Sequence, residues 1–171
     1  MAGNDVNLGT FKVTAYGESI KIETLTGGFT FTDGGTTNAA ATLRNGKLLF
    51  STDGSSWTQY GSTATLLAAG TSFTTNYTVV TGAPVLVQLH ADVYDNDGTG
   101  ALDTSDTIIA KIVAGSLNAQ RIDSLGSFNA PGTAVSANTL SITSGTAILS
   151  KDGTRANQTT TLPVTNFKIG S

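Results

Sequence analysis

The fold class is indicated most clearly by residues 85–94, which read Val85-Leu86-Val87-Gln88-Leu89-His90-Ala91-Asp92-Val93-Tyr94. Every second residue from Val85 to Val93 is apolar, and most of the residues between them are polar or carry a polar tip. Successive side chains of a β-strand point to opposite faces, so a period of two places one apolar face against a core. The stretch therefore predicts a strand with one buried face.

An acidic loop of twelve residues follows this strand and ends at Asp106. Its spacing matches the calcium loop of an EF-hand, in which alternate residues supply oxygen atoms that converge on one ion. The predicted ligands are the side chains of Asp95, Asp97, Thr99, Asp103 and Asp106 and the backbone carbonyl of Ala101, with Gly100 at the turn. No Lys or Arg lies between Asp92 and Asp106. Because the carboxylates would repel one another, we expect Ca²⁺ among them.

Both flanks of the acidic loop have the pattern of strands, whereas an EF-hand has helices there. Residues 107–113 are β-branched and too few for a convincing helix. We therefore expect a hairpin from Pro84 to Val113 and a structural rather than a sensory calcium, because no helix pair is predicted to open. Asp at position 12 reaches an ion less easily than Glu, so we expect modest affinity; extracellular calcium modules bind with dissociation constants of about 10⁻⁴–10⁻³ M. The competing interpretation is an acidic, solvated turn without metal.

The rest of the chain consists of short apolar–polar alternations separated by Gly, Asp and Asn. We expect one break at Gly27-Gly28 and a hairpin turn at Asn45-Gly46, the dipeptide most typical of such turns. Further strands are expected at Ala147–Leu149 and Leu162–Ile169. No window keeps a helical period over ten or more residues. The sequence therefore predicts an all-β fold in one domain, residues 1–171 with a tag-like start at 1–4: a single antiparallel β-sandwich of jelly-roll or Greek-key/Ig-like type.

Composition excludes several classes of partner. Charged residues make up 12% of the 171 residues, the net charge is −3 and the pI is near 4.8. This balance offers no basic surface for nucleic acid. No segment is apolar and long enough for membrane insertion, and no signal peptide is visible. Cysteine is absent, so disulfides and thiol chemistry are excluded.

The two ends of the sequence look like halves of one junction. Asn7–Ala15 opens on a strand, and the sequence Phe167-Lys168-Ile169-Gly170-Ser171 would run into such a strand if two copies were joined. With Leu140–Gly145 and Lys151–Gly153, this pattern resembles the repeating β-sandwich modules of large bacterial cell-surface proteins. The resemblance implies a stalk, adhesin or surface-layer role, an extracellular location, and neighbouring copies or domains as partners. The acidic loop separately resembles dockerin and EF-hand calcium loops.

Candidate catalytic residues are few. His90 is the only histidine, and it lies on the face of its strand opposite Val87 and Leu89. Glu18 and Glu23 are the only glutamates. The sequence has neither a phosphate-binding GxxxxGK[ST] loop nor a dinucleotide-binding GxGxxG unit. We therefore expect a non-enzymatic protein.

Three alternatives concern what the module does at a surface. Aromatic residues could form a platform for glycans, which would make the domain a carbohydrate-binding module; the residues are Trp57, Tyr60, Tyr77 and Tyr94. The segment Asp5–Ala15 could complete a neighbour's sheet in a filament. Lys12 or Lys21 could form an isopeptide bond with Asn166, helped by Glu23 or an Asp. The simpler interpretation of these residues is ordinary packing and solvent exposure.

Overall fold

The computed structural model describes residues 3–35, 41–94 and 102–143, and within them every regular element is a β-strand. The all-β fold expected from the sequence is confirmed, and no helix in this part of the chain could cross a bilayer. The strands are β1 (Gly3–Val13), β2 (Ile20–Thr32), β3 (Thr42–Ser51), β4 (Thr58–Leu66), β5 (Thr71–Val79), β6 (Val85–Tyr94), β7 (Thr107–Ile112), β8 (Ala119–Arg121), β9 (Ser127–Phe128) and β10 (Val135–Ser141).

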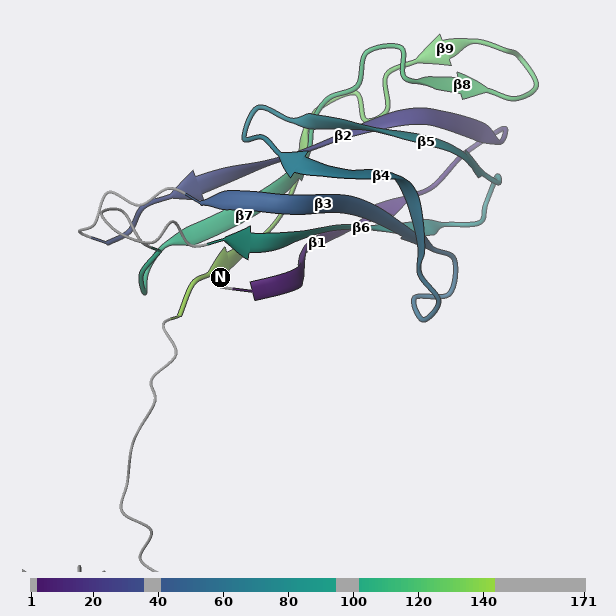
Figure 1. The fold of residues 1–171 in the computed structure, drawn as a ribbon. Coiled ribbons are helices and arrows are strands. Elements are labelled where there is room, and N and C mark those ends of the chain that lie inside the picture. Colours follow the sequence, from purple (N-terminus) through teal and green to yellow (C-terminus); the bar gives the residue numbers. More distant parts are fainter. Residues whose placement is uncertain (1–2, 36–40, 95–101, 144–171) are drawn as a thin grey trace, which may run out of the picture.

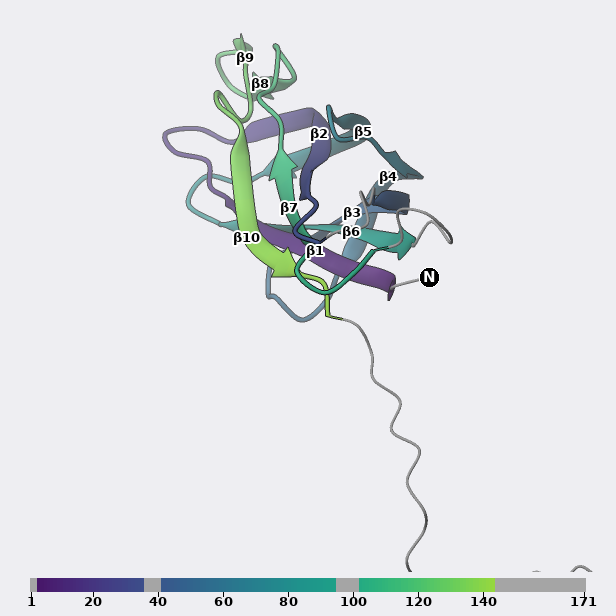
Figure 2. The ribbon, with the colours of Figure 1, turned by 90° about the vertical axis from the view of Figure 1, so that its left-hand side faces the viewer.

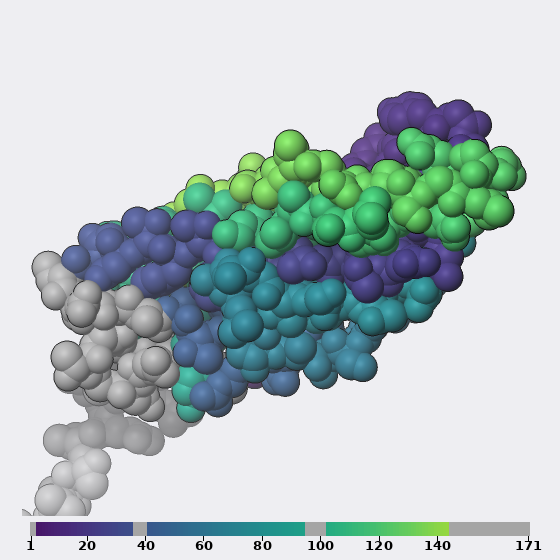
Figure 3. Space-filling view, turned by 90° about the horizontal axis from the view of Figure 1, so that it is seen from above, coloured from purple at the N-terminus to yellow at the C-terminus, as the bar shows by residue number. Residues whose placement is uncertain are grey.

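Two antiparallel sheets form the layers of a sandwich-like fold (Figure 1). One sheet has the order β1-β6-β3-β4. In the other, β2 pairs with β5 on one side and with β7 and β8 on the other, β10 is added to β7 (Figure 2), and β9 to β8. The outline is elongated, with the green C-terminal part of the described chain along one long side (Figure 3).

The core lies between the two sheets. The five alternate residues from Val85 to Val93 are each at most 6% exposed, so the period of two that predicted β6 does mark its buried face. β2 and β7 supply the opposing side chains, among them Leu25, Phe29 and Ile108. β6 is flanked by β1 and β3, and it is therefore a central strand whose two edges are both occupied.

The predicted break at Gly27-Gly28 is wrong, because β2 continues through both residues. A Cβ at Gly27 would lie 3.0 Å from a methyl group of Leu89, and one at Gly28 would lie 3.2 Å from the carbonyl oxygen of Ala68. These glycines allow neighbouring chain segments to approach β2 closely. A local sequence pattern cannot distinguish such a contact from a turn.

The predicted hairpin turn at Asn45-Gly46 is also wrong, because β3 continues from Thr42 to Ser51. Asn45 does adopt the left-handed conformation that favours this dipeptide in turns, with φ 52°. It does so in a β-bulge, where the register with β6 shifts between Arg44 and Lys47. The Asn45 amide donates a hydrogen bond of 2.7 Å to Asp92 on β6, which holds the bulge against the sheet.

The third correction concerns the connection from β6 to β7. These strands belong to different sheets, so the predicted hairpin from Pro84 to Val113 does not exist and the acidic loop is a crossover between layers. The physical reason is that β1 and β3 take both edges of β6, leaving β7 to pair with β2 and β10. The strands expected at 147–149 and 162–169 lie outside the described residues.

Candidate metal centre

The described part of the acidic loop is residues 102–106, and it includes two of the predicted ligands, Asp103 and Asp106. Asp95, Asp97, Thr99 and Ala101 lie outside the described residues. The described geometry of the candidate site therefore consists of residues 102–106, which lead into β7, and of the segments that pack against them.

Asp106 is the most buried charged side chain of the described chain, with 0% exposure. Its Oδ1 accepts a hydrogen bond of 3.0 Å from the backbone N–H of Gly34, and its Oδ2 accepts one of 3.0 Å from the N–H of Asp103. Among the described residues it forms no salt bridge. Each carboxylate oxygen can accept a further interaction, so both retain the capacity to face a cation.

The turn Asp33-Gly34-Gly35 at the end of β2 packs directly on the acidic loop. A Cβ on Gly34 would overlap the carbonyl of Ser105, and a Cβ on Gly35 would overlap the carboxylate of Asp103. Sequence analysis did not connect these residues with the acidic loop, because the contact spans about 70 positions of the chain and depends on the fold. The available signal was the pair of adjacent glycines, which often marks close approach of another segment.

A third segment, at the end of β10, completes the junction. The N–H of Ile142 donates a hydrogen bond of 2.8 Å to the carbonyl of Asp106, and the N–H of Ser105 donates one of 3.4 Å to the carbonyl of Ile142. Ser105 has φ 104°, a left-handed value that is uncommon for a residue with a side chain. The loop's last residues are therefore held between the ends of β2 and β10.

Calcium fits the chemistry of the described part of this site, which holds two of the six predicted ligands, since Asp103 and Asp106 offer hard carboxylate oxygens. The described residues alone contain no group of three or more side chains that could hold a metal. A complete coordination shell needs about 6–8 oxygens. The described segment could therefore supply only part of one, and residues 95–101 would have to supply the rest.

His90 belongs to a separate polar cluster on the outer face of the β1-β6-β3 sheet. Its Nδ1 is 3.0 Å from Asp5 Oδ1 and its Nε2 is 3.0 Å from Gln88 Oε1, while Lys47 Nζ lies 2.9 Å from the same Asp5 oxygen. Hydrogen bonds from Lys47, and then from His90, lower the pKa of Asp5. The cluster ties β1 to β3 and β6.

The four residues of the predicted aromatic platform do not lie together in one group. Tyr60 and Tyr77 pack with the buried Phe50, with ring centroids 4.7–5.0 Å apart, and burial raises the pKa of Tyr77. The guanidinium carbon of Arg44 lies 4.0 Å from the centroid of the Tyr94 ring. Trp57 is half-buried. Two of the four rings thus contribute to packing beside the core.

The residues of the predicted isopeptide cross-link are only partly described. Lys12 and Glu23 are exposed and Lys21 is half-buried, whereas Asn166 lies outside the described residues. A cross-link of this kind uses a buried carboxylic acid, and Glu23 does not provide one.

No family model matches the chain, and no curated protein or solved structure matches it significantly. What the described residues define is a class of architecture: an all-β protein of two packed antiparallel sheets whose layers are connected by an acidic crossover.

Proposed function

We propose that the protein is a non-enzymatic, extracellular structural module in which calcium bound by the 95–106 loop fastens the two sheets together. The observation that carries this proposal is the burial of Asp106, the position-12 carboxylate, at the crossover between layers. Burying a carboxylate costs several kcal/mol unless partners compensate its charge. Two backbone N–H groups do so in part, and a cation beside Asp103 and Asp106 would complete the compensation.

From the resemblance to repeating surface modules we infer a role in a stalk, adhesin or surface layer, with neighbouring copies or domains as partners. A filament built by exchange of Asp5–Ala15 would first have to remove β1 from its own sheet, where it pairs with β6 from Gly3 to Val13. A glycan-binding role is supported less, because Tyr60 and Tyr77 contact Phe50 beside the core. Retention of the domain by a polysaccharide in affinity electrophoresis would reverse this preference.

The test of the calcium proposal is thermal unfolding in calcium, in magnesium and in excess chelator. Calcium at about 100 times its dissociation constant would add roughly 2.7 kcal/mol to the free energy of unfolding. We expect the wild-type protein to melt several degrees higher in calcium than in chelator, and the Asp95→Ala/Asp97→Ala variant to show no difference. A control variant, Glu23→Ala/Asp123→Ala, removes two exposed carboxylates elsewhere and should keep the calcium response.

Asp106→Asn separates the metal from a purely structural role of the buried carboxylate. If calcium binds, this variant loses the difference between calcium and chelator. Should the variant be destabilised equally in both conditions while wild type shows no calcium response, Asp106 serves only as a hydrogen-bond acceptor for Gly34 and Asp103, and the proposal is wrong.

A further inference from the structure

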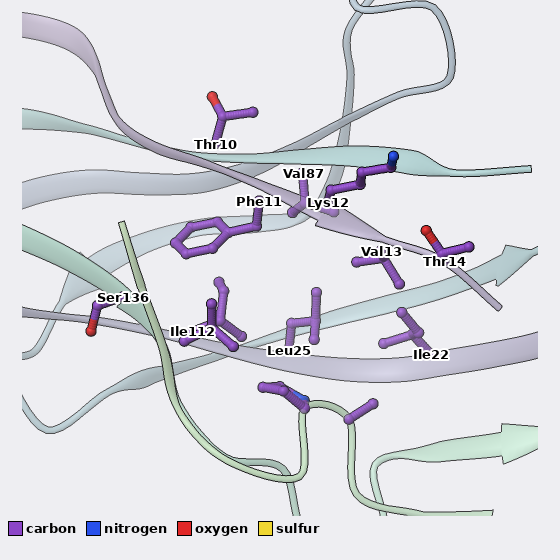
Figure 4. Close-up of a pocket in the computed structure, with 13 residues that line it drawn as sticks. Thr10, Phe11, Lys12, Val13, Thr14, Ile22, Leu25, Val87, Ile112 and Ser136 are labelled. Carbon is purple, nitrogen blue, oxygen red and sulfur yellow. The ribbon is translucent and has the colours of Figure 1, made fainter. Parts of the chain in front are cut away.

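An apolar pocket opens between β1 and the segment that leads into β10. Its volume is about 430 Å³, and Phe11, Val13, Ile22, Leu25 and Ile112 form its apolar walls (Figure 4). Lys12, Thr14 and Ser136 lie at its polar rim. A volume of this size is within the range that accommodates small ligands or a few large side chains. The pocket therefore has room for an apolar segment at the side of the sandwich.

The pocket lies beside an edge strand. β1 is the last strand of its sheet, and within the described residues it pairs with β6 alone. β1 and β10 touch at Gly9, where a Cβ would overlap that of Ala137. Beyond this contact, residues 10–13 of β1 and Thr14, which follows the strand, line the pocket. An edge strand directs alternate N–H and C=O groups outward, so this part of β1 can accept another strand.

The sequence contains a segment whose pattern matches this pocket. Residues 162–169 read Leu162-Pro163-Val164-Thr165-Asn166-Phe167-Lys168-Ile169. Phe167-Lys168-Ile169 repeats the pattern of Phe11-Lys12-Val13, in which Phe11 is buried and Lys12 is exposed. In an extended segment Phe167 and Ile169 share one face and Lys168 takes the other.

The connection to this segment is long enough to reach the pocket. The described chain ends at Thr143, just after β10, which lies along the same side of the molecule as β1. Extended, residues 144–161 can span about 60 Å. The length of β10, which separates Thr143 from the pocket, is about 23 Å. Attachment to the same chain also gives the segment an effective concentration in the millimolar range.

We propose that the pocket between β1 and β10 is the docking site of the chain's own segment Leu162–Ile169. Its backbone lies along the free edge of β1 from Thr10 to Val13, and Phe167 and Ile169 enter the pocket. Pro163, which has no N–H group, suits a strand at the edge of a sheet. The proposal is independent of calcium binding, so the two can fail separately.

A spin label tests this proposal on the full chain. The sequence has no cysteine, so Lys168→Cys gives a unique thiol on the face of the segment that points away from the pocket. With the nitroxide on the same ¹⁵N-labelled chain, the amide signals of residues 10–14 and 135–136 should lose intensity. That loss should persist on tenfold dilution, while the amide of Leu66 on β4 keeps its intensity.

Two further samples assign the occupant. Adding Phe167→Asp to the labelled chain should remove the intensity loss and lower the melting temperature, whereas Thr160→Asp in the same segment should do neither. In a second sample, ¹⁵N-labelled chains without a nitroxide are mixed with nitroxide-carrying chains of natural isotope content. The amide signals of this mixture should lose no intensity. Loss in that mixture would assign the pocket to a second copy, and no loss in any sample would leave the pocket to another ligand; either result overturns the proposal.

Discussion

Asn118 connects three parts of the chain through one side chain. Its amide donates hydrogen bonds to the carbonyls of Thr24 (2.7 Å) and Ala130 (2.6 Å), and its Oδ1 accepts one of 2.8 Å from the N–H of Ala130. The side chain therefore fixes the approach to β8 against both β2 and the loop before β10. Removing such a residue leaves several partly buried backbone groups without their partner.

We expect Asn118→Ala to lower the free energy of unfolding by about 1–3 kcal/mol. The matched control is Asn129→Ala, because Asn129 Oδ1 accepts a single exposed hydrogen bond, from the N–H of Leu117. Urea unfolding of both variants measures the difference. Equal stability losses would show that the three bonds of Asn118 are no more important than the one of Asn129.

Asp53 gives the turn between β3 and β4 a pH dependence. Hydrogen bonds from the N–H groups of Ser56 and Ser55, and then from the hydroxyl of Ser51, lower the pKa of this exposed carboxyl from 3.8 to about 2. A lowered pKa means that the folded state favours the carboxylate. Its stabilising contribution is therefore present above pH 3.8 and is lost as the pH falls through about 2.

The carboxyl carbon of Asp53 should accordingly titrate in the folded protein with a midpoint of about 2, as measured by NMR. Ser51→Ala removes one donor and should move the midpoint upward. The stability difference between wild type and Asp53→Asn should shrink as the pH falls below 3.8. A difference that stays constant down to pH 2 would contradict the assignment of these hydrogen bonds.

At the scale of elements, β1 and β10 approach each other closely at Gly9 and Ala137. A methyl group on Gly9 would overlap the Cβ of Ala137, so Gly9→Ala should lower the free energy of unfolding by about 1–3 kcal/mol. Ala137→Gly in the same chain makes room and should restore part of that loss. Chemical unfolding of the single and double variants measures the coupling between the two sites.

Gly132→Ala is the control for backbone effects, because a Cβ there meets nothing within 4 Å. It should leave stability unchanged or raise it by about 0.4–1 kcal/mol through the unfolded state. Additive effects of Gly9→Ala and Ala137→Gly would show that the two strands do not constrain each other.

Prediction of elements from the sequence succeeded where one face of a strand is buried. It failed where residues typical of turns are required instead by contacts with distant parts of the chain. The alternation of residues 85–94 identified β6 because its two faces meet core and surface. Gly27-Gly28 and Asn45-Gly46 have the composition of turns, yet they serve a close approach and a bulge. For the candidate site, the spacing predicts Asp103 and Asp106 as ligands, and this stays a prediction. The packing of Gly34 and Gly35 on these residues follows from which strands lie in which sheet.

The whole molecule depends on contacts between the two layers, and Leu89 lies at their centre. It is fully buried on β6, and its methyl groups face Gly27 of the opposite sheet. Leu89→Ala should lower the free energy of unfolding by about 2–5 kcal/mol, because it leaves a cavity between the sheets. Leu67→Ala, at a position 57% exposed, should cost far less. Calorimetry of the two variants checks this, and similar melting temperatures would contradict the central role of Leu89.

The order of strands has a consequence for how the chain acquires its structure. β1 has its partner in β6, and β2 has its partners in β5, β7 and β8, so most pairings join distant parts of the sequence. Folding rates fall when native contacts are separated by long stretches of chain, which places all-β sandwiches in the range of milliseconds to seconds. During synthesis, β1 emerges from the ribosome before β6 does, and it must wait for residues 85–94 before it can pair. Throughout that interval Leu8 and Phe11 lack the contacts that bury them in the folded chain, and exposed apolar side chains of this kind favour aggregation.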